Sequence, residues 1–339
     1  MSRLGDLRVN DAVLTAVAYG YAQAESCLPF VAPTITVPTR SGKILQFGRE
    51  QFAVTNTKRV PYAQHKRSKV SGYGTRNYIL EQHTHAAEVA FEEIEEAANG
   101  AANIDLKELA VLDAVAKIEQ SLEVELFSLI TNPANFATGN AITVAAANQF
   151  SNGGSDPEAL VRTWKSAVRQ KIGRYPNKAI ISEDVYNALT LHPTFRERTK
   201  HTQLQTTDLD LLAAWFGLPG GIKVAQRLYL NPATGELEDM FPAGTMLMFV
   251  DGTASAGTIG PTTESAQPIF QQQPGIARTT ATFAQMYVLN GGLRVGQERI
   301  DLDNDTYVWT VRFDGSVVLT SVDIDSDLST AGILIQGLL

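Results

Sequence analysis

The stretch that most constrains the fold runs from Asp105 to Thr131, reads DLKELAVLDAVAKIEQSLEVELFSLIT, and contains neither glycine nor proline. Its apolar side chains recur three or four positions apart, which aligns them on one face of an α-helix. Glu108, three residues after Asp105, suits a capped start, and Asn132 before Pro133 predicts the end. The stretch predicts a helix of about 40 Å, longer than most globular helices. The residues of the apolar face are Val111, Val115, Ile118, Leu122, Leu126 and Leu129.

Two interpretations of this helix are open. It is either a core helix of a large domain or a strut that organises an assembly, and its neighbours in the sequence favour the strut. As a strut, it should pack its apolar face under the C-terminal strands. Its other face, with Lys107, Lys117 and Glu123, should then meet solvent or the interior of the assembly.

The segment before this helix predicts a long β-hairpin with a polar, basic tip. Lys43–Val54 and Thr75–His83 are rich in aromatic and β-branched residues, which favour strands. Two strands of about ten residues reach about 35 Å. Because an isolated two-stranded ribbon is only marginally stable in water, the hairpin needs a surface to lie on.

The charge changes sign along this part of the chain. Residues 40–76 hold nine Lys or Arg and one acid, whereas residues 81–96 hold six Glu and neither Lys nor Arg. These stretches are solvated faces, or they meet between two copies of the chain, or the loop binds nucleic acid with Tyr62 and Tyr73 as stacking groups. The overall charge of -8 argues against nucleic-acid coating as the main role. The candidate contacts between copies are Lys58, Arg59, Lys66, Arg67, Lys69, Arg76, Glu88, Glu92, Glu93, Glu95 and Glu96.

Residues 1–38 do not form a self-sufficient unit. A short amphipathic helix is predicted at Asn10–Gln23, and the three prolines of CLPFVAPTITVPTR predict an extended apolar arm. The arm lies either on its own domain or on a neighbouring copy. Cys27 is the only cysteine, so an internal disulfide and a thiol-rich metal site are excluded, and it has no adjacent base for a nucleophilic role.

Residues 156–275 predict a compact α/β module. Asp156 and Pro157 should begin a helix that ends at Gly173, and Thr207 should cap a helix that ends at Gly217. Apolar strands and further helices fill the rest, and residues 252–275 form a long loop. After this loop, strands are predicted at residues 277–289, 307–313 and 317–324, with Asp314-Gly315 as a tight hairpin turn.

The remaining polar residues form no recognisable catalytic, cofactor or metal motif. The two DxDxD runs lack the Gly and Glu of a helix-loop-helix calcium site. His83 and His85 should share one face of a strand, but the nearby sequence offers no third ligand. No signal peptide and no run of 18 apolar residues occurs, which fits the cytoplasm and no membrane. The expectation is a protein that is not an enzyme, without cofactor or metal.

The order of arm, basic hairpin, acidic stretch, long helix, inserted module and returning strands resembles the major capsid proteins of tailed bacteriophages, with the Hong Kong 97-type shell fold. SGKILQFGREQFAV followed by TKRVPYAQHKRSKV is similar to the extended loop of that family. PNKAIISEDVYNALTLHPTFRERTKHTQ is similar to a segment of one branch of it. The resemblance implies an α+β subunit with an N-terminal arm at 1–38, an extended loop at 39–80, a peripheral domain at 81–155 and 276–339, and an axial domain at 156–275.

The resemblance also implies a function. The chain would be a structural protein of the virion that assembles in the host cytoplasm, through hexamers and pentamers, into an icosahedral head shell around double-stranded DNA. Portal, scaffolding and decoration proteins would be partners, and packaged DNA would be contacted non-specifically. An encapsulin-type nanocompartment shell shares the fold, and a cytoplasmic α+β enzyme is the alternative from another class.

Two family features are expected to be missing. A cleaved N-terminal scaffolding domain has no room before a chain that begins at Met1, so scaffolding should be a separate protein or absent. A cross-link from a loop lysine to an asparagine of a neighbour is not expected, because no sequence pattern marks it. Lys43, Lys58, Lys66 and Lys69 are candidates for that bond by position only.

Overall fold

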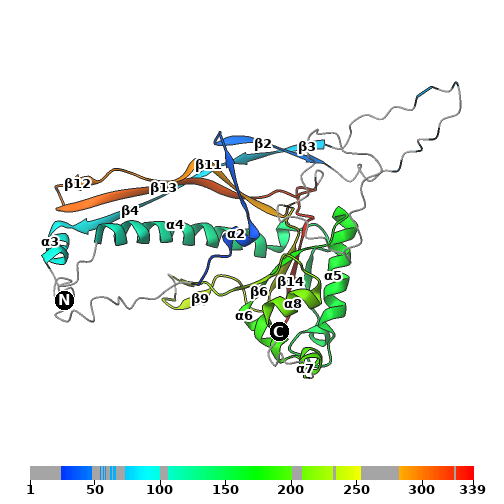
Figure 1. Ribbon diagram of the computed structural model, residues 1–339. Helices are drawn as coiled ribbons and strands as arrows, with labels where there is room; N and C mark the ends of the chain where they lie inside the picture. Colours follow the sequence, from blue (N-terminus) through cyan, green and yellow to red (C-terminus); the bar gives the residue numbers. More distant parts are fainter. Residues whose placement is uncertain are drawn as a thin grey trace.

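The computed structural model describes residues 24–47, 73–99, 106–200, 208–231, 234–252, 282–323 and 326–339, together with residues 54, 56, 58, 62, 64 and 65. An elongated half contains the long helix and one sheet, and a compact half contains a second sheet with its helices (Figure 1). The helix predicted at Asn10–Gln23 lies outside the described residues. Within the described ranges, no helix combines the length and apolar composition needed to cross a bilayer.

The predicted long helix is confirmed as α4, Leu106–Thr131, which runs the length of the elongated half (Figure 1). Its buried face includes Ile118, Leu122 and Leu126, and it packs against strands β4 and β13. The expectation that its apolar face lies under the C-terminal strands is therefore confirmed for β13. Asp105 lies outside the described residues, so its predicted capping role stays a prediction.

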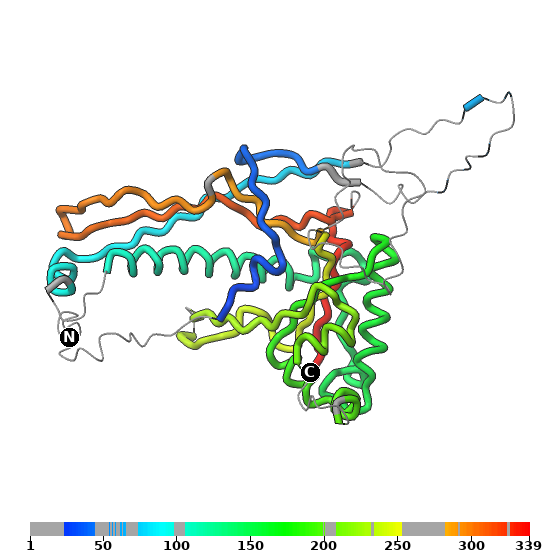
Figure 2. Tube along the Cα trace, viewed as in Figure 1, coloured from blue at the N-terminus to red at the C-terminus, as the bar shows by residue number. Residues whose placement is uncertain are grey.

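The first sheet covers α4 and has the order β1-β11-β13-β12, with β4 also paired to β13. The backbone traces of β4, β11 and β13 run side by side over α4 (Figure 2). All these pairings are antiparallel except that of β1 with β11. The strands are β1 Thr34–Val37, β4 Glu81–Ala90, β11 Ala284–Val295, β12 Arg299–Asp301 and β13 Thr306–Leu319.

The predicted hairpin turn at Asp314-Gly315 is wrong, because β13 runs straight through both residues. Gly315 pairs with Val288 of β11 and also with Glu81 of β4, so both edges of the backbone are occupied. The Asp314 side chain is buried, and its carboxylate accepts a charged contact from Arg40 at 3.2 Å. A dipeptide that often forms turns is held here in a strand by pairing on both sides.

The second sheet has the order β5-β14-β10-β6-β7 and forms the core of the compact half. Its central strand β10 is completely buried along Met246–Phe249. Two of its five strands come from outside the predicted module at residues 156–275. The strand β5 precedes the module in the sequence, and β14 follows it. The strands are β5 Ala141–Thr143, β6 Lys178–Ser182, β7 Ile222–Ala225, β10 Met246–Phe249 and β14 Gly332–Gln336.

The helices of the compact half begin and end close to the predicted positions. The Asp156 side chain accepts hydrogen bonds from the amides of Glu158 and Ala159, and Gly173 ends α5 with a left-handed φ of 76°. Asp208 caps α8, while Thr207 lies outside the described residues. The helices are α5 Pro157–Ile172, α6 Glu183–Leu191, α7 Pro193–Thr199 and α8 Leu209–Phe216.

The predicted hairpin is present as a two-stranded ribbon that rests on the first sheet. Tyr78 of the ribbon stacks on Tyr287 of β11 with 4.9 Å between ring centroids. The predicted strand Thr75–His83 is instead two strands, because the chain changes partner at Leu80: Ile79 pairs with Ser41 of β2, whereas Glu81 pairs with Gly315 of β13. The ribbon consists of β2 Ser41–Phe47 and β3 Tyr73–Ile79.

The described part of the N-terminal segment lies on its own chain. Pro29 occupies the first turn of a short helix, a position that proline tolerates, so this part is not extended as predicted. Cys27, Leu28 and Val31 are buried against the core, and β1 then joins the first sheet. The remaining short elements are α2 Leu28–Val31, α3 Phe91–Asn99, β8 Leu228–Leu230, β9 Leu237–Asp239, and single 3-10 turns at Pro133–Asn135 and Ala146–Asn148.

Candidate assembly surfaces

Of the basic residues predicted to contact another copy, Lys58 and Arg76 belong to the described part of the chain. The Arg76 guanidinium, on β3, donates to the carbonyl of Leu319 at 2.9 Å and lies 3.7 Å from the carboxylate of Asp327. Arg76 therefore binds the end of β13 in its own chain. Arg59, Lys66, Arg67 and Lys69 lie outside the described residues.

The acidic candidates occupy the end of β4 and the helix that follows it. Glu88 of β4, with Glu92 and Glu95 of α3, is exposed, whereas Glu93 and Glu96 are half-buried. Phe91 anchors this helix on the first sheet, with its ring 4.5 Å from that of Tyr307. The helix thus presents its exposed carboxylates at the free end of the elongated half (Figure 1).

The basic loop and the acidic helix leave the fold at opposite ends of one run of strand. The ribbon continues at Leu80 into β4, so Tyr73–Ala90 is almost continuously extended. At about 3.3 Å per residue this run spans on the order of 50 Å. The loop joins the ribbon at Tyr73, and α3 begins directly after Ala90, at the far end of α4 (Figure 1).

A buried charge pair fixes the N-terminal segment to the long helix and to the compact half. Glu123 of α4 is completely buried and accepts hydrogen bonds from the amide of Cys27 at 2.7 Å and the hydroxyl of Ser26 at 3.2 Å. The guanidinium of Arg227 completes the contact, and it also donates to the carbonyl of Ala24 at 3.2 Å. The prediction that Glu123 faces solvent is therefore wrong, because a partner 104 positions away in the sequence compensates its charge.

Burial also determines the chemistry of the only cysteine. Desolvation, followed by the negative charge of Glu123, raises the pKa of the Cys27 thiol to about 12. Its sulfur lies 4.0 Å from the carbonyl oxygen of Val224. Because the thiolate is the reactive form, this thiol is inert at neutral pH.

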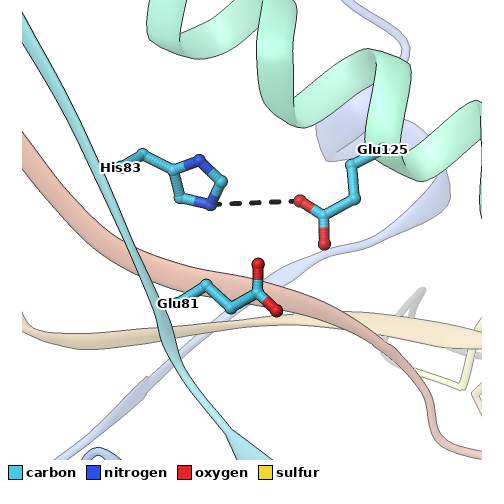
Figure 3. Close-up of side chains that lie close together, drawn as sticks. All are labelled: Glu81, His83 and Glu125. Carbon is cyan, nitrogen blue, oxygen red and sulfur yellow. Dashed lines mark ion pairs between the residues drawn. The ribbon is translucent and has the colours of Figure 1, made fainter.

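Three potential metal ligands come together between β4 and α4, which pack against each other. Glu81 and His83 of β4 face Glu125 of α4, and one ligand atom from each lies within 4.8 Å of the others (Figure 3). The pKa of the Glu125 carboxyl is raised, mainly by burial and then by the charge of Glu81. The sequence analysis paired His83 with His85 and overlooked Glu81, although Glu81 is two positions before His83 on the same strand. It also missed Glu125, because that residue is on another element and 42 positions away.

Comparison with known proteins shows sequence similarity over most of the chain. A family model described as phage major capsid protein E matches residues 135–279. The major capsid protein of Burkholderia phage BcepMu is 31% identical over 250 residues, which cover 74% of this chain and 79% of that protein.

Solved structures are similar over nearly the whole length. A phage-related protein from Bordetella bronchiseptica RB50 has a TM-score of 0.69 at 24% identity and covers 98% of both chains. The capsid structure of cyanophage P-SCSP1u has a TM-score of 0.56 at 13% identity and covers 94% of this chain and 90% of that one. A protein of Mycobacterium phage Bobi has a TM-score of 0.52 at 12% identity and covers 96% of both chains.

Proposed function

Because the chain belongs to the family of phage major capsid proteins, we propose that its loop and its acidic helix join neighbouring copies in the head shell. The Hong Kong 97-type fold predicted from the order of the elements is confirmed. The protein forms the capsid of the virion, and the sequence identity of 31% to a curated major capsid protein is the observation that carries this conclusion. That identity also favours a capsid over an encapsulin-type shell, for which the fold alone makes no distinction.

The proposed mechanism is binding without catalysis. Each basic loop would lie on the acidic helix of a neighbour, and electrostatic complementarity would select the correct orientation of the two copies. Repeating these contacts around closed rings would give hexamers and pentamers, and many modest contacts together would hold the shell. Portal, scaffolding and decoration proteins, and non-specific contact with packaged DNA, complete the proposed partners.

The division into an arm at 1–38, a loop at 39–80, a peripheral domain and an axial domain is part of the proposal. The sheet pairings favour one change to it. We assign β5 and β14 to the axial domain with residues 156–275, because they pair with each other and β14 pairs with β10 inside that sheet. The peripheral domain then consists of α3, α4 and the first sheet.

A charge exchange tests the mechanism. Replacing Lys66, Arg67 and Lys69 together by Glu should abolish closed shells at low salt, as seen by electron microscopy and size-exclusion chromatography. Adding Glu92→Lys and Glu95→Lys to the same chain should restore them, because the attraction is rebuilt with the signs exchanged. Salt should weaken wild-type assembly over the same range, since exposed charges are screened within about 10 Å at 0.1 M.

Matched variants keep this test specific. Arg174→Glu with Lys200→Glu changes two exposed basic residues of the compact half and should leave assembly as in the wild type. Normal shells from the Lys66, Arg67 and Lys69 variant at low salt would show that the loop charge does not orient the copies.

A further inference from the structure

We propose that Glu81, His83 and Glu125 bind a divalent transition-metal ion that links strand β4 to the long helix α4. Glu81 and His83 are two positions apart on one strand, so both side chains extend from the same face. That face is turned toward α4, where Glu125 extends to meet them (Figure 3). The two elements also pack against each other along their length. A metal here would join the sheet and the helix of the elongated half.

The distances suit closure around one ion. The Nε2 atom of His83 is 3.9 Å from a carboxylate oxygen of Glu125, and the three ligand atoms lie within 4.8 Å of one another. Ligand atoms about 2.1 Å from a tetrahedral zinc ion are about 3.4 Å apart. Rotations of the two glutamate side chains that move their carboxylate oxygens by roughly an ångström bring the ligand atoms to that spacing. The backbone need not move.

One polar atom of this cluster, the Nε2 atom of His83, lacks a partner that a cation would supply. The Nε2 atom of His83 is buried and makes no hydrogen bond, and 3.9 Å to Glu125 exceeds hydrogen-bond length. A buried ring nitrogen without a partner is costly. Carboxylate oxygens of Glu81 and Glu125 also lie within 4.8 Å of each other, so the two side chains repel when both are ionised. A bound cation would satisfy the nitrogen and remove the repulsion.

The ligand set selects the metal. One imidazole nitrogen and two carboxylates suit Zn²⁺ or Mn²⁺, whereas Ca²⁺ and Mg²⁺ prefer oxygen ligands throughout. Glu81 is exposed, so solvent reaches the site and water can fill the remaining position. Three protein ligands with a place for water is an arrangement that zinc accepts.

Zinc titration of the full-length protein tests the site. The protein is first treated with a chelator and then titrated with ZnCl₂ by calorimetry, while thermal unfolding is followed in parallel. We expect saturable binding and a rise in the melting temperature. His83→Asn and Glu125→Gln should each weaken zinc binding at least tenfold. His85→Asn changes a histidine on the same strand outside the cluster and should leave the affinity unchanged.

Other outcomes separate this proposal from its alternatives. If Glu125→Gln fails to fold, Glu81→Gln removes an exposed ligand and should weaken zinc binding without loss of structure. Co²⁺ should bind in place of zinc and give the visible absorption of a low-coordinate site, which His83→Asn should abolish. Zinc binding that is equal in the wild type, His83→Asn and Glu125→Gln would refute the site. A melting temperature that does not rise with zinc would likewise refute the site.

Discussion

At the scale of single residues, Glu123 connects three parts of the molecule that are distant in the sequence. Its carboxylate lies on α4, its hydrogen-bond donors Ser26 and Cys27 precede α2, and its charge partner Arg227 follows β7. A buried carboxylate is tolerated because a cation and hydrogen bonds replace its water. This side chain therefore helps to hold the described N-terminal segment in place, together with the burial of Leu28 and Val31 and the pairing of β1 with β11.

Glu123→Leu should destabilise the unassembled subunit by about 3–5 kcal/mol, because it leaves the buried Arg227 guanidinium with only the partly exposed carboxylate of Glu119, 3.7 Å away. Denaturant unfolding followed by circular dichroism measures the change. The double variant Glu123→Leu with Arg227→Met should recover most of the loss. As a control, Lys117→Ala removes an exposed ion pair with Asp113 and should cost less than about 1 kcal/mol. A single variant as stable as the wild type would refute this role of Glu123.

The reactivity of the Cys27 thiol measures the same contact between Glu123 and the N-terminal segment. A thiol pKa raised from 9.0 to about 12 lowers the thiolate fraction at pH 8.5 by a factor on the order of a thousand. Folded protein should therefore react with a thiol reagent far more slowly than protein in denaturant. Glu123→Leu should accelerate labelling, because it removes both a negative neighbour and the hydrogen bond that holds the Cys27 amide. Equal labelling rates in folded and denatured wild type would contradict the burial of Cys27.

At the scale of elements, the second sheet predicts which fragment of the chain can fold. Residues 156–275 alone lack β5 and β14, so the β10 edge that pairs with β14 would be left open. Expressed alone, this fragment should remain unfolded. Residues 135–275 joined by a short linker to 326–339 should give dispersed amide signals in nuclear magnetic resonance, since all five strands are present. A folded 156–275 fragment would show that the two outer strands are dispensable.

The elements that sequence could predict are those determined by local patterns. The apolar spacing of α4, the Asp156 cap and the glycine stops at Gly173 and Gly217 each act within a few residues, and each is confirmed. They depend on periodicity and on backbone groups that nearby side chains satisfy. The order of these elements was sufficient to indicate the fold.

The features that sequence could not predict depend on partners far along the chain. Asp314-Gly315 resembles a turn, but two neighbouring strands hold it extended. Glu123 resembles a solvent-facing charge until Arg227 is placed beside it. The cluster of Glu81 and His83 is completed only by Glu125, which comes from the helix below β4 and is 42 positions from His83 in the sequence. In each case, tertiary contact overrides the local preference.

At the scale of the whole molecule, the ribbon that carries the ends of the basic loop and the acidic helix α3 lie apart on the elongated half. The ribbon that leads to residues 48–72 lies over the compact end of α4, and α3 lies at the other end (Figure 1). In the proposed mechanism, the loop of one copy binds the acidic helix of the next, and repetition of that contact gives a closed ring. The shape of the chain thus fits the shell that its family forms.

Deleting Thr55–Gly72 should separate folding from assembly. The described contacts that fix the ribbon, including the stacking of Tyr78 on Tyr287, lie outside the deleted residues, so the subunit should keep its fold. Closed shells should be lost, because the bridge between copies is removed. Circular dichroism measures folding, and electron microscopy and size-exclusion chromatography measure assembly.

A second variant replaces the same residues with a Gly-Ser linker of equal length. If the linker variant forms normal shells, the loop supplies only length, and the charges of Lys66, Arg67 and Lys69 are not needed. If neither variant forms shells, and if Glu92→Lys with Glu95→Lys restores shells to the charge-reversed loop, then the charge pairing itself is what closes the shell.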